Sequence, residues 1–109
     1  MAHFLLQGAY SADAWKALLN KPENRINTVT PIVENLGGKV ISGYFSFGEY
    51  DVIVIMELPD NVTAAAFSLA IAAGGAFKSH KTTALMTGDE GIEAMKKGAA
   101  ITNYRAPGK

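Results

Sequence analysis

The chain has 109 residues, of which 49% are hydrophobic, and its ten basic and ten acidic side chains give a formal net charge of zero. This length and composition suffice for one domain with its own core, while the absence of cysteine excludes disulfides, thiolate metal sites and thiol nucleophiles. Because no basic stripe is broad enough to neutralise several phosphates in a row, the charge pattern also argues against nucleic-acid binding.

The first predicted element is a β-strand over residues 3–10. Ser11 then offers a helix N-cap, and Asp13 in the first turn suits the exposed amides and the helix dipole. The segment 20–24 breaks this helix, and Pro22 suits the first position of a new one. Two helical stretches are therefore expected after the first strand.

The second helical stretch is marked by apolar residues at helical spacing from Ile26 to Leu36, with the glycine pair 37–38 as its C-terminal stop. Pro31 lies inside it and cannot donate to the carbonyl four residues earlier. We expect a bend at this proline, or a restart of the helix with Thr30 as its cap.

Two further strands are predicted over residues 39–47 and 50–58, and the very short link between them makes the pair antiparallel. A cap at residues 60–61 opens a helix over 62–73, and a fourth strand follows over 77–87. The order β-α-β-β-α-β is that of the ferredoxin-like α+β fold, an antiparallel four-stranded sheet with two helices on one face.

A short additional helix is predicted at the C-terminus. Thr87 and Glu90 have the spacing of a capping box, and the helix they open ends near Gly98. We therefore expect a ferredoxin-like domain over residues 1–88, with the helix and tail of residues 89–109 as part of the same domain.

Two helices on one face of a sheet leave the other face bare. Residues 52–56 are apolar on both sides of their strand, so both faces of the sheet need cover. Exposed apolar patches of roughly several hundred Å² mark interaction surfaces. We therefore predict a homodimer that packs face to face through its sheets.

The helix after the hairpin has no obvious solvent face, because residues 61–77 contain no charged side chain. Burial against a further subunit, in an oligomer larger than a dimer, is one hypothesis. A membrane span is not expected, since the run is short of the ~20 apolar residues needed and is diluted by polar residues and glycines. The N-terminus lacks the features of a secretory signal, so a cytoplasmic location is expected.

The tetrapeptide Gly-Glu-Tyr-Asp at residues 48–51 stands between two hydrophobic strands, with Pro-Asp-Asn at 59–61 and a threonine pair at 82–83. This arrangement resembles the GYD-domain family, named for its glycine, tyrosine and aspartate. The resemblance covers most of the chain and leaves the tail after about Gly91 as an addition. Further similar segments lie at residues 21–25 and 36–40.

The resemblance implies membership of the dimeric α/β-barrel superfamily, in which two ferredoxin-like sheets pack face to face. It implies no particular activity or cofactor, because the relatives include cofactor-independent monooxygenases, haem-degrading enzymes, isomerases and ligand-sensing regulatory domains. Pro31 departs from the family pattern, which usually has an uninterrupted helix at this point, and it bears on the shape of any cavity beneath that helix.

The turn itself has a structural and a chemical interpretation. Glycine at Gly48 suits a turn that needs an unusual φ, Asp51 can bond neighbouring amides, and Tyr50 can pack its ring at the start of a strand. The structural interpretation of this motif is preferred. The alternative makes Asp51 a proton acceptor at the rim of a cavity, with Tyr50 as a donor.

The two histidines are general-base candidates because imidazole titrates near neutral pH. In this topology His3 lies near the end of the fourth strand, several residues from His80, so the two are too far apart to share a metal ion. We expect no metal site. His80 is the better single candidate for catalysis or ligand binding, and a solvated edge-strand histidine is its structural alternative.

Three other side chains are candidates for contact with a ligand. Tyr44 lies between Ser42 and Ser46, and its hydroxyl could point into a cavity between sheet and helices. Trp15 and Arg25 could close such a cavity from the helical side, although a core anchor and a surface ion pair are their structural alternatives.

Three functions remain open on these grounds. The favoured one is an oligomeric module that binds a small apolar or aromatic molecule, without a cofactor. The second is an enzyme resembling cofactor-independent monooxygenases or isomerases, with His80 or Asp51 as the proton-transfer group. The third is a structural oligomerisation unit without any ligand.

Overall fold

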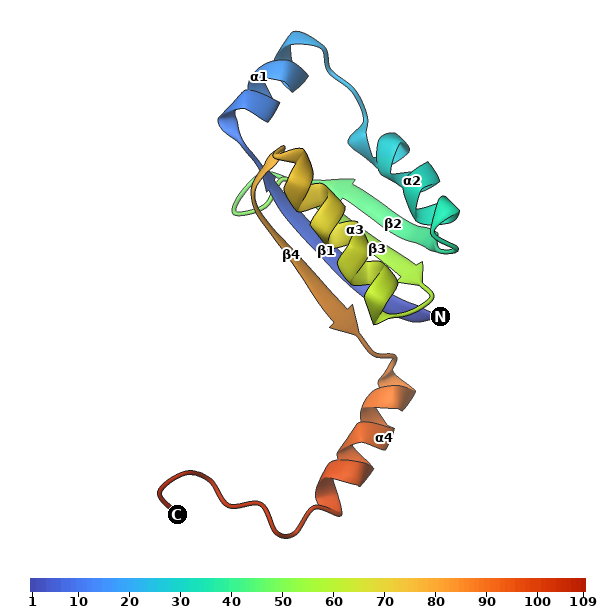
Figure 1. The fold of residues 1–109 in the computed structure, drawn as a ribbon, viewed down its shortest axis with the longest axis vertical. Helices are drawn as coiled ribbons and strands as arrows, with labels where there is room; N and C mark the ends of the chain where they lie inside the picture. Colours follow the sequence, from blue (N-terminus) through green and yellow to red (C-terminus); the bar gives the residue numbers. More distant parts are fainter.

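The computed structural model describes residues 1–109, and its elements follow the predicted order, including the short helix at the C-terminus (Figure 1). The strands are β1 (Ala2–Tyr10), β2 (Lys39–Phe45), β3 (Val52–Leu58) and β4 (Phe77–Leu85). The helices are α1 (Ala12–Asn20), α2 (Arg25–Asn35), α3 (Asn61–Gly74) and α4 (Gly88–Ala99). None of these helices has the length and apolar character needed to cross a membrane.

The four strands form one antiparallel sheet in the order β2-β3-β1-β4. Helices α2 and α3 lie over the same face of this sheet, whereas α1 lies beyond the end of the sheet where β1 stops (Figure 1). The predicted ferredoxin-like α+β fold is therefore confirmed.

The hydrophobic core lies between the sheet and these two helices. Every second residue of β3 is buried and the residues between them are half-buried, as the alternation of a strand requires. Helix α2 contributes Val33 and helix α3 contributes Ala64 and Phe67 to the same cluster. The strand residues of this cluster are Phe4, Leu6, Tyr10, Val52, Val54, Met56 and Leu58.

Helix α2 begins later than the sequence predicts, and it does not restart at Thr30. Asn24 is its N-cap, with the side-chain oxygen accepting from the Ile26 amide at 3.0 Å, so the predicted start at Pro22 is wrong. The helix runs unbroken through Pro31, and the hydroxyl of Thr30 donates to the Ile26 carbonyl at 2.8 Å instead of capping a new helix. Pro31 removes a single backbone bond, a loss offset by packing of this helix on the sheet.

An irregularity in β2 decides which of its residues face the helices. The pairing of β2 with β3 shifts between Val40 and Ser42, so Val40 falls on the helix-covered face, opposite Met56. Simple alternation would have placed Val40 on the same side as Tyr44. Tyr44 pairs with Ile53 and lies on the bare face, where its side chain is 63% exposed.

The face of the sheet away from the helices is largely apolar at its centre. Leu5, Ile53 and Ile55 lie there only half-buried. At one end of this face, His3 and Glu57 approach to 3.2 Å between Nε2 and Oε1. Nothing in the chain itself covers this surface.

Helix α4 projects away from the sheet at the end where β4 stops (Figure 1). The predicted capping box is confirmed, because Thr87 Oγ1 accepts from the Glu90 amide at 3.1 Å and Glu90 Oε1 accepts from the Thr87 amide at 2.9 Å. Every residue from 92 to 109 is exposed. The radius of gyration is accordingly 17.4 Å, against about 13 Å for a compact chain of about 100 residues.

Candidate functional site

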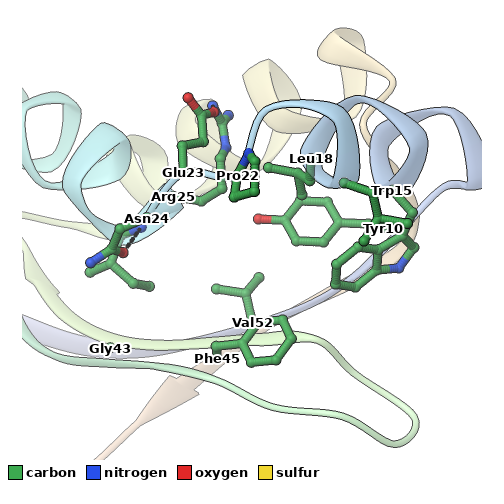
Figure 2. A pocket seen from close by; sticks show the side chains of 12 residues that line it. Tyr10, Trp15, Leu18, Pro22, Glu23, Asn24, Arg25, Gly43, Phe45 and Val52 are labelled. Carbon is green, nitrogen blue, oxygen red and sulfur yellow. Dashed lines mark hydrogen bonds and ion pairs between the residues drawn. The ribbon is translucent and has the colours of Figure 1, made fainter.

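A large hollow lies at the end of the sheet, under the segment that joins α1 to α2 (Figure 2). Its volume is about 650 Å³, within the range of small-molecule sites. Seven of its twelve lining residues are hydrophobic. The walls are formed by Tyr10, Trp15, Leu18, Leu19, Pro22, Glu23, Asn24, Arg25, Ile26, Gly43, Phe45 and Val52.

Aromatic rings form one side of this pocket. The rings of Trp15 and Tyr10 are nearly perpendicular at a centroid distance of 5.4 Å, and those of Trp15 and Phe45 are nearly perpendicular at 6.0 Å. On the side of β4, Tyr10 stacks on Phe77 at 4.8 Å. Contacts of this kind hold rings in defined orientations, so the pocket has a flat-sided aromatic wall.

The polar groups of the pocket gather at its opposite side. Arg25 donates from Nη1 to Glu23 Oε1 at 2.7 Å, and the hydroxyl of Tyr10 points towards the side where these two residues lie (Figure 2). Burial raises the pKa of Tyr10, and the nearby Arg25 guanidinium opposes that rise. The hydrogen bond from Arg25 to Glu23 raises the pKa of Arg25. The phenol is therefore neutral at physiological pH and the ion pair carries little net charge.

The close approach of α2 to β2 shapes the floor of the pocket. A Cβ added at Gly43 would come within 2.9 Å of the Ile26 side chain, which is closer than carbon atoms pack. A second hollow of about 280 Å³ lies between α2, α3 and the sheet. It shares Tyr10, Arg25 and Val52 with the first, so the two hollows are adjacent.

Asp51 ties the hairpin to the strand that enters the pocket. Its carboxylate accepts a hydrogen bond from the Tyr10 amide at 2.9 Å, and its own amide donates to the Gly8 carbonyl at 2.8 Å. Across the turn, the Ser46 hydroxyl donates to the Tyr50 carbonyl at 2.7 Å. Gly48 adopts a φ of 152°, which side chains disfavour.

The structure brings together some of the residues singled out from the sequence and separates others. Trp15 and Arg25 both line the large pocket. Tyr44 lies on the opposite face of the sheet and does not line it. His80 pairs with Gly8 near the edge of the sheet, 6.2 Å from the Phe77 ring, and lines neither hollow. The two histidines are as far apart as predicted, because His3 pairs with Leu85.

Sequence reasoning missed Tyr10 and Phe45, which contribute the centre of the aromatic wall. The available signal was strand alternation, since Tyr10 continues the buried face of Phe4 and Leu6 up to the end of β1. No group of three or more His, Cys, Asp or Glu residues could hold a metal ion.

One known protein family matches most of the chain. The model of the family described as the GYD domain matches residues 4–95. The chain belongs to the GYD domain family. This GYD domain match ends at residue 95, inside α4, so it extends a few residues further than the resemblance seen from the sequence.

Two solved structures are similar to this GYD domain protein in fold. One, the hypothetical protein PHS023 from Pyrococcus horikoshii, has a TM-score of 0.51 and 17% identity, covering 80% of this chain and 92% of that one. The other, FFRP-DM1, has a TM-score of 0.49 and 20% identity, covering 79% of this chain and 100% of that one. Among curated proteins none matches. At these identities the likeness concerns the fold alone.

Proposed function

We propose that this GYD domain protein is a cytoplasmic, homo-oligomeric module that binds a small, flat and largely apolar molecule in the pocket lined by Tyr10, Trp15 and Arg25. The observation that carries the proposal is the pocket itself, with its volume of about 650 Å³ and its aromatic wall. Rings held edge-on to one another present flat surfaces on which a planar molecule can stack.

The polar side of the pocket favours a neutral oxygen acceptor on that molecule. Arg25 has N–H donors beyond the one given to Glu23, and the neutral phenol of Tyr10 can donate as well. Because Glu23 already balances the charge of Arg25, a carboxylate would gain less here than at an unpaired guanidinium. A planar ketone is therefore a suitable probe.

The test compares 2-acetylnaphthalene with 2-isopropenylnaphthalene, which has the same heavy-atom skeleton with a CH2 group in place of the carbonyl oxygen. Trp15 is the sole tryptophan of the chain, so quenching of its fluorescence reports binding at the pocket wall directly. We expect the ketone to bind about tenfold more tightly, which corresponds to ~1.4 kcal/mol for one hydrogen bond.

The matched variants are Arg25→Ala, in the pocket, and Arg105→Ala, in the exposed tail. Arg25→Ala should abolish the preference for the ketone, whereas Arg105→Ala should leave it unchanged. Absence of any binding by either naphthalene would contradict the proposal and leave the structural oligomerisation unit as the better account.

The oligomeric part of the proposal is supported by the uncovered face of the sheet. Only 12 of the 109 residues are buried in the single chain, and exposed large hydrophobic side chains are more numerous than that. A second copy of the chain that packs its own bare face on this one would cover both surfaces at once.

A further inference from the structure

Helix α3 has an apolar face that points away from the sheet and that nothing in the chain covers. Val62 is 79% exposed and Leu69 is 70% exposed, and no residue of this helix is charged. The hydroxyls of Ser68 and Thr82 lie 2.6 Å apart and fix the rotation of the helix on the sheet. The exposed stripe consists of Val62, Ala65, Ala66, Leu69, Ala72 and Ala73.

Helix α4 has a second uncovered apolar stripe. Ile92 is 51% exposed and Met95 is 73% exposed, and the two lie on the same side of the helix at a spacing of three residues. Gly88 and Ala99 extend this stripe at helical spacing. The charged residues of α4 occupy the opposite side, so the helix is clearly amphipathic. They are Asp89, Glu90, Glu93, Lys96 and Lys97.

An amphipathic helix of this length needs a surface to pack on. Isolated helices shorter than about 12–15 residues are marginal in water, and most helical stability in proteins comes from packing of the apolar side. Helix α4 has 12 residues and projects from the body (Figure 1). Its capping box stabilises the first turn but covers none of its apolar stripe.

The chain cannot bring α4 onto the outer face of its own α3. Between the end of β4 at Leu85 and the start of α4 at Gly88 lie two residues, a reach of roughly 10 Å at full extension. A helix is about 10 Å across, so the axis of a helix lying on the outer face of α3 stands roughly 15 Å above the layer of the sheet. The short link does not limit contact between α4 and the outer face of α3 in a second chain.

We propose that α4 of one chain docks its Ile92 and Met95 stripe on the outer face of α3 in a second copy of the same chain. The alanines of α3 and the glycines of α4 allow the helix axes to approach to about 8–10 Å. The charged side of α4 then faces water, while the uncharged stripe of α3 is covered. A single stripe with two large side chains is small for a stable interface, and reciprocal exchange between two chains doubles the area buried.

This contact is separate from the sheet-to-sheet contact, because it uses the opposite side of the fold. A chain that has both contacts forms an assembly of at least four copies. A chain that has only the helix exchange forms a dimer.

The first test uses the natural absence of cysteine. The double variant Leu69→Cys with Met95→Cys, at two strongly exposed positions, is oxidised and run on a non-reducing gel. We expect covalently linked species of two or more chains. A disulfide confined to single chains, or no disulfide at all, would overturn the proposal. The control, Leu69→Cys with Glu93→Cys, places the second thiol on the charged side of α4 and should cross-link at least tenfold more slowly.

The second test measures the number of chains per assembly by native mass spectrometry. In Ile92→Glu with Met95→Glu we expect that number to fall by at least a factor of two, whereas Glu93→Gln with Lys97→Gln should keep the wild-type value. An unchanged number in the first variant overturns the helix exchange. It leaves the sheet-to-sheet contact and the ligand pocket untouched, since none of these residues belongs to either.

Discussion

At the scale of single residues, Asp51 links three parts of the fold through its side chain and its backbone. Its carboxylate accepts from the amide of Tyr10, which lies at the end of β1 and contributes its ring to the pocket wall. The backbone of the same residue bonds Gly8 on β1 and Ser46 beyond the end of β2. One residue of the family tetrapeptide therefore sets the position of an aromatic side chain that is distant in sequence.

Substitution Asp51→Ala should lower the free energy of unfolding by about 1–3 kcal/mol, because the buried amide of Tyr10 loses its acceptor. The thermal midpoint should fall by roughly 5–15 °C in a calorimetric scan. Asp51→Asn retains an acceptor oxygen and should recover most of the loss. Unchanged melting of Asp51→Ala, together with altered binding of the ketone probe, would instead assign this residue to the chemistry of the pocket.

At the scale of elements, each of the four helices begins at a residue whose side chain caps its first turn. The Asp60 side chain accepts from the Thr63 amide at 2.8 Å and from the Thr63 hydroxyl at 2.7 Å at the start of α3. These bonds lower the pKa of Asp60 below its ordinary value of 3.8. A carboxylate with a depressed pKa in the folded state stabilises the fold above its unfolded pKa, and this contribution is lost as the pH falls through the folded pKa.

The variant Asp60→Asn keeps a side-chain acceptor but has no charge to lose. Between about pH 5 and about pH 2, the wild type should therefore lose more stability to acid than the variant does, measured as the difference between their urea midpoints. Glu90→Gln should be compared in the same assay, because the hydrogen bonds between Thr87 and Glu90 lower the pKa of the Glu90 carboxyl in the same way. Parallel acid profiles for the wild type and Asp60→Asn would show that the cap is not coupled to the fold.

The sequence was sufficient for the order of the elements but not for the faces of β2 or the walls of the pocket. Strand alternation, the short hairpin and the glycine stops predicted each strand and helix to within a few residues. The pairing shift after Val40 depends on contacts with β3, so local alternation could not place Tyr44 on the bare face. The pocket is built from β1, α1, α2 and β2, and its aromatic contacts exist only after these elements pack.

At the scale of the whole molecule, the single chain has more exposed large hydrophobic side chains than buried residues. The bare face of the sheet has Tyr44 exposed on its edge strand β2, beside Ile53 of β3, and helix α4 stands away from the body. Surfaces of this kind in a chain of zero formal net charge favour self-association, because no electrostatic repulsion between copies opposes it.

Substitution Tyr44→Glu should weaken the sheet-to-sheet contact without unfolding the chain, since the side chain is already exposed in the single copy. A charge placed on this apolar face, next to Ile53, should raise the dissociation constant at least about tenfold, as measured by sedimentation equilibrium. Leu19→Glu, at a somewhat more exposed position on α1, serves as the control and should leave association unchanged. Equal effects of the two substitutions would argue against this face as the interface.

Helix α1 is a weakly anchored part of the pocket wall, because none of its residues is fully buried and only Ala14, Trp15 and Leu18 pack against the core. Local opening of such a weakly attached segment needs far less energy than global unfolding. Its amides should exchange with deuterium well before those of β1 or β3. Opening of α1 alone would therefore give a solute access to the pocket while the sheet and the other helices stay folded.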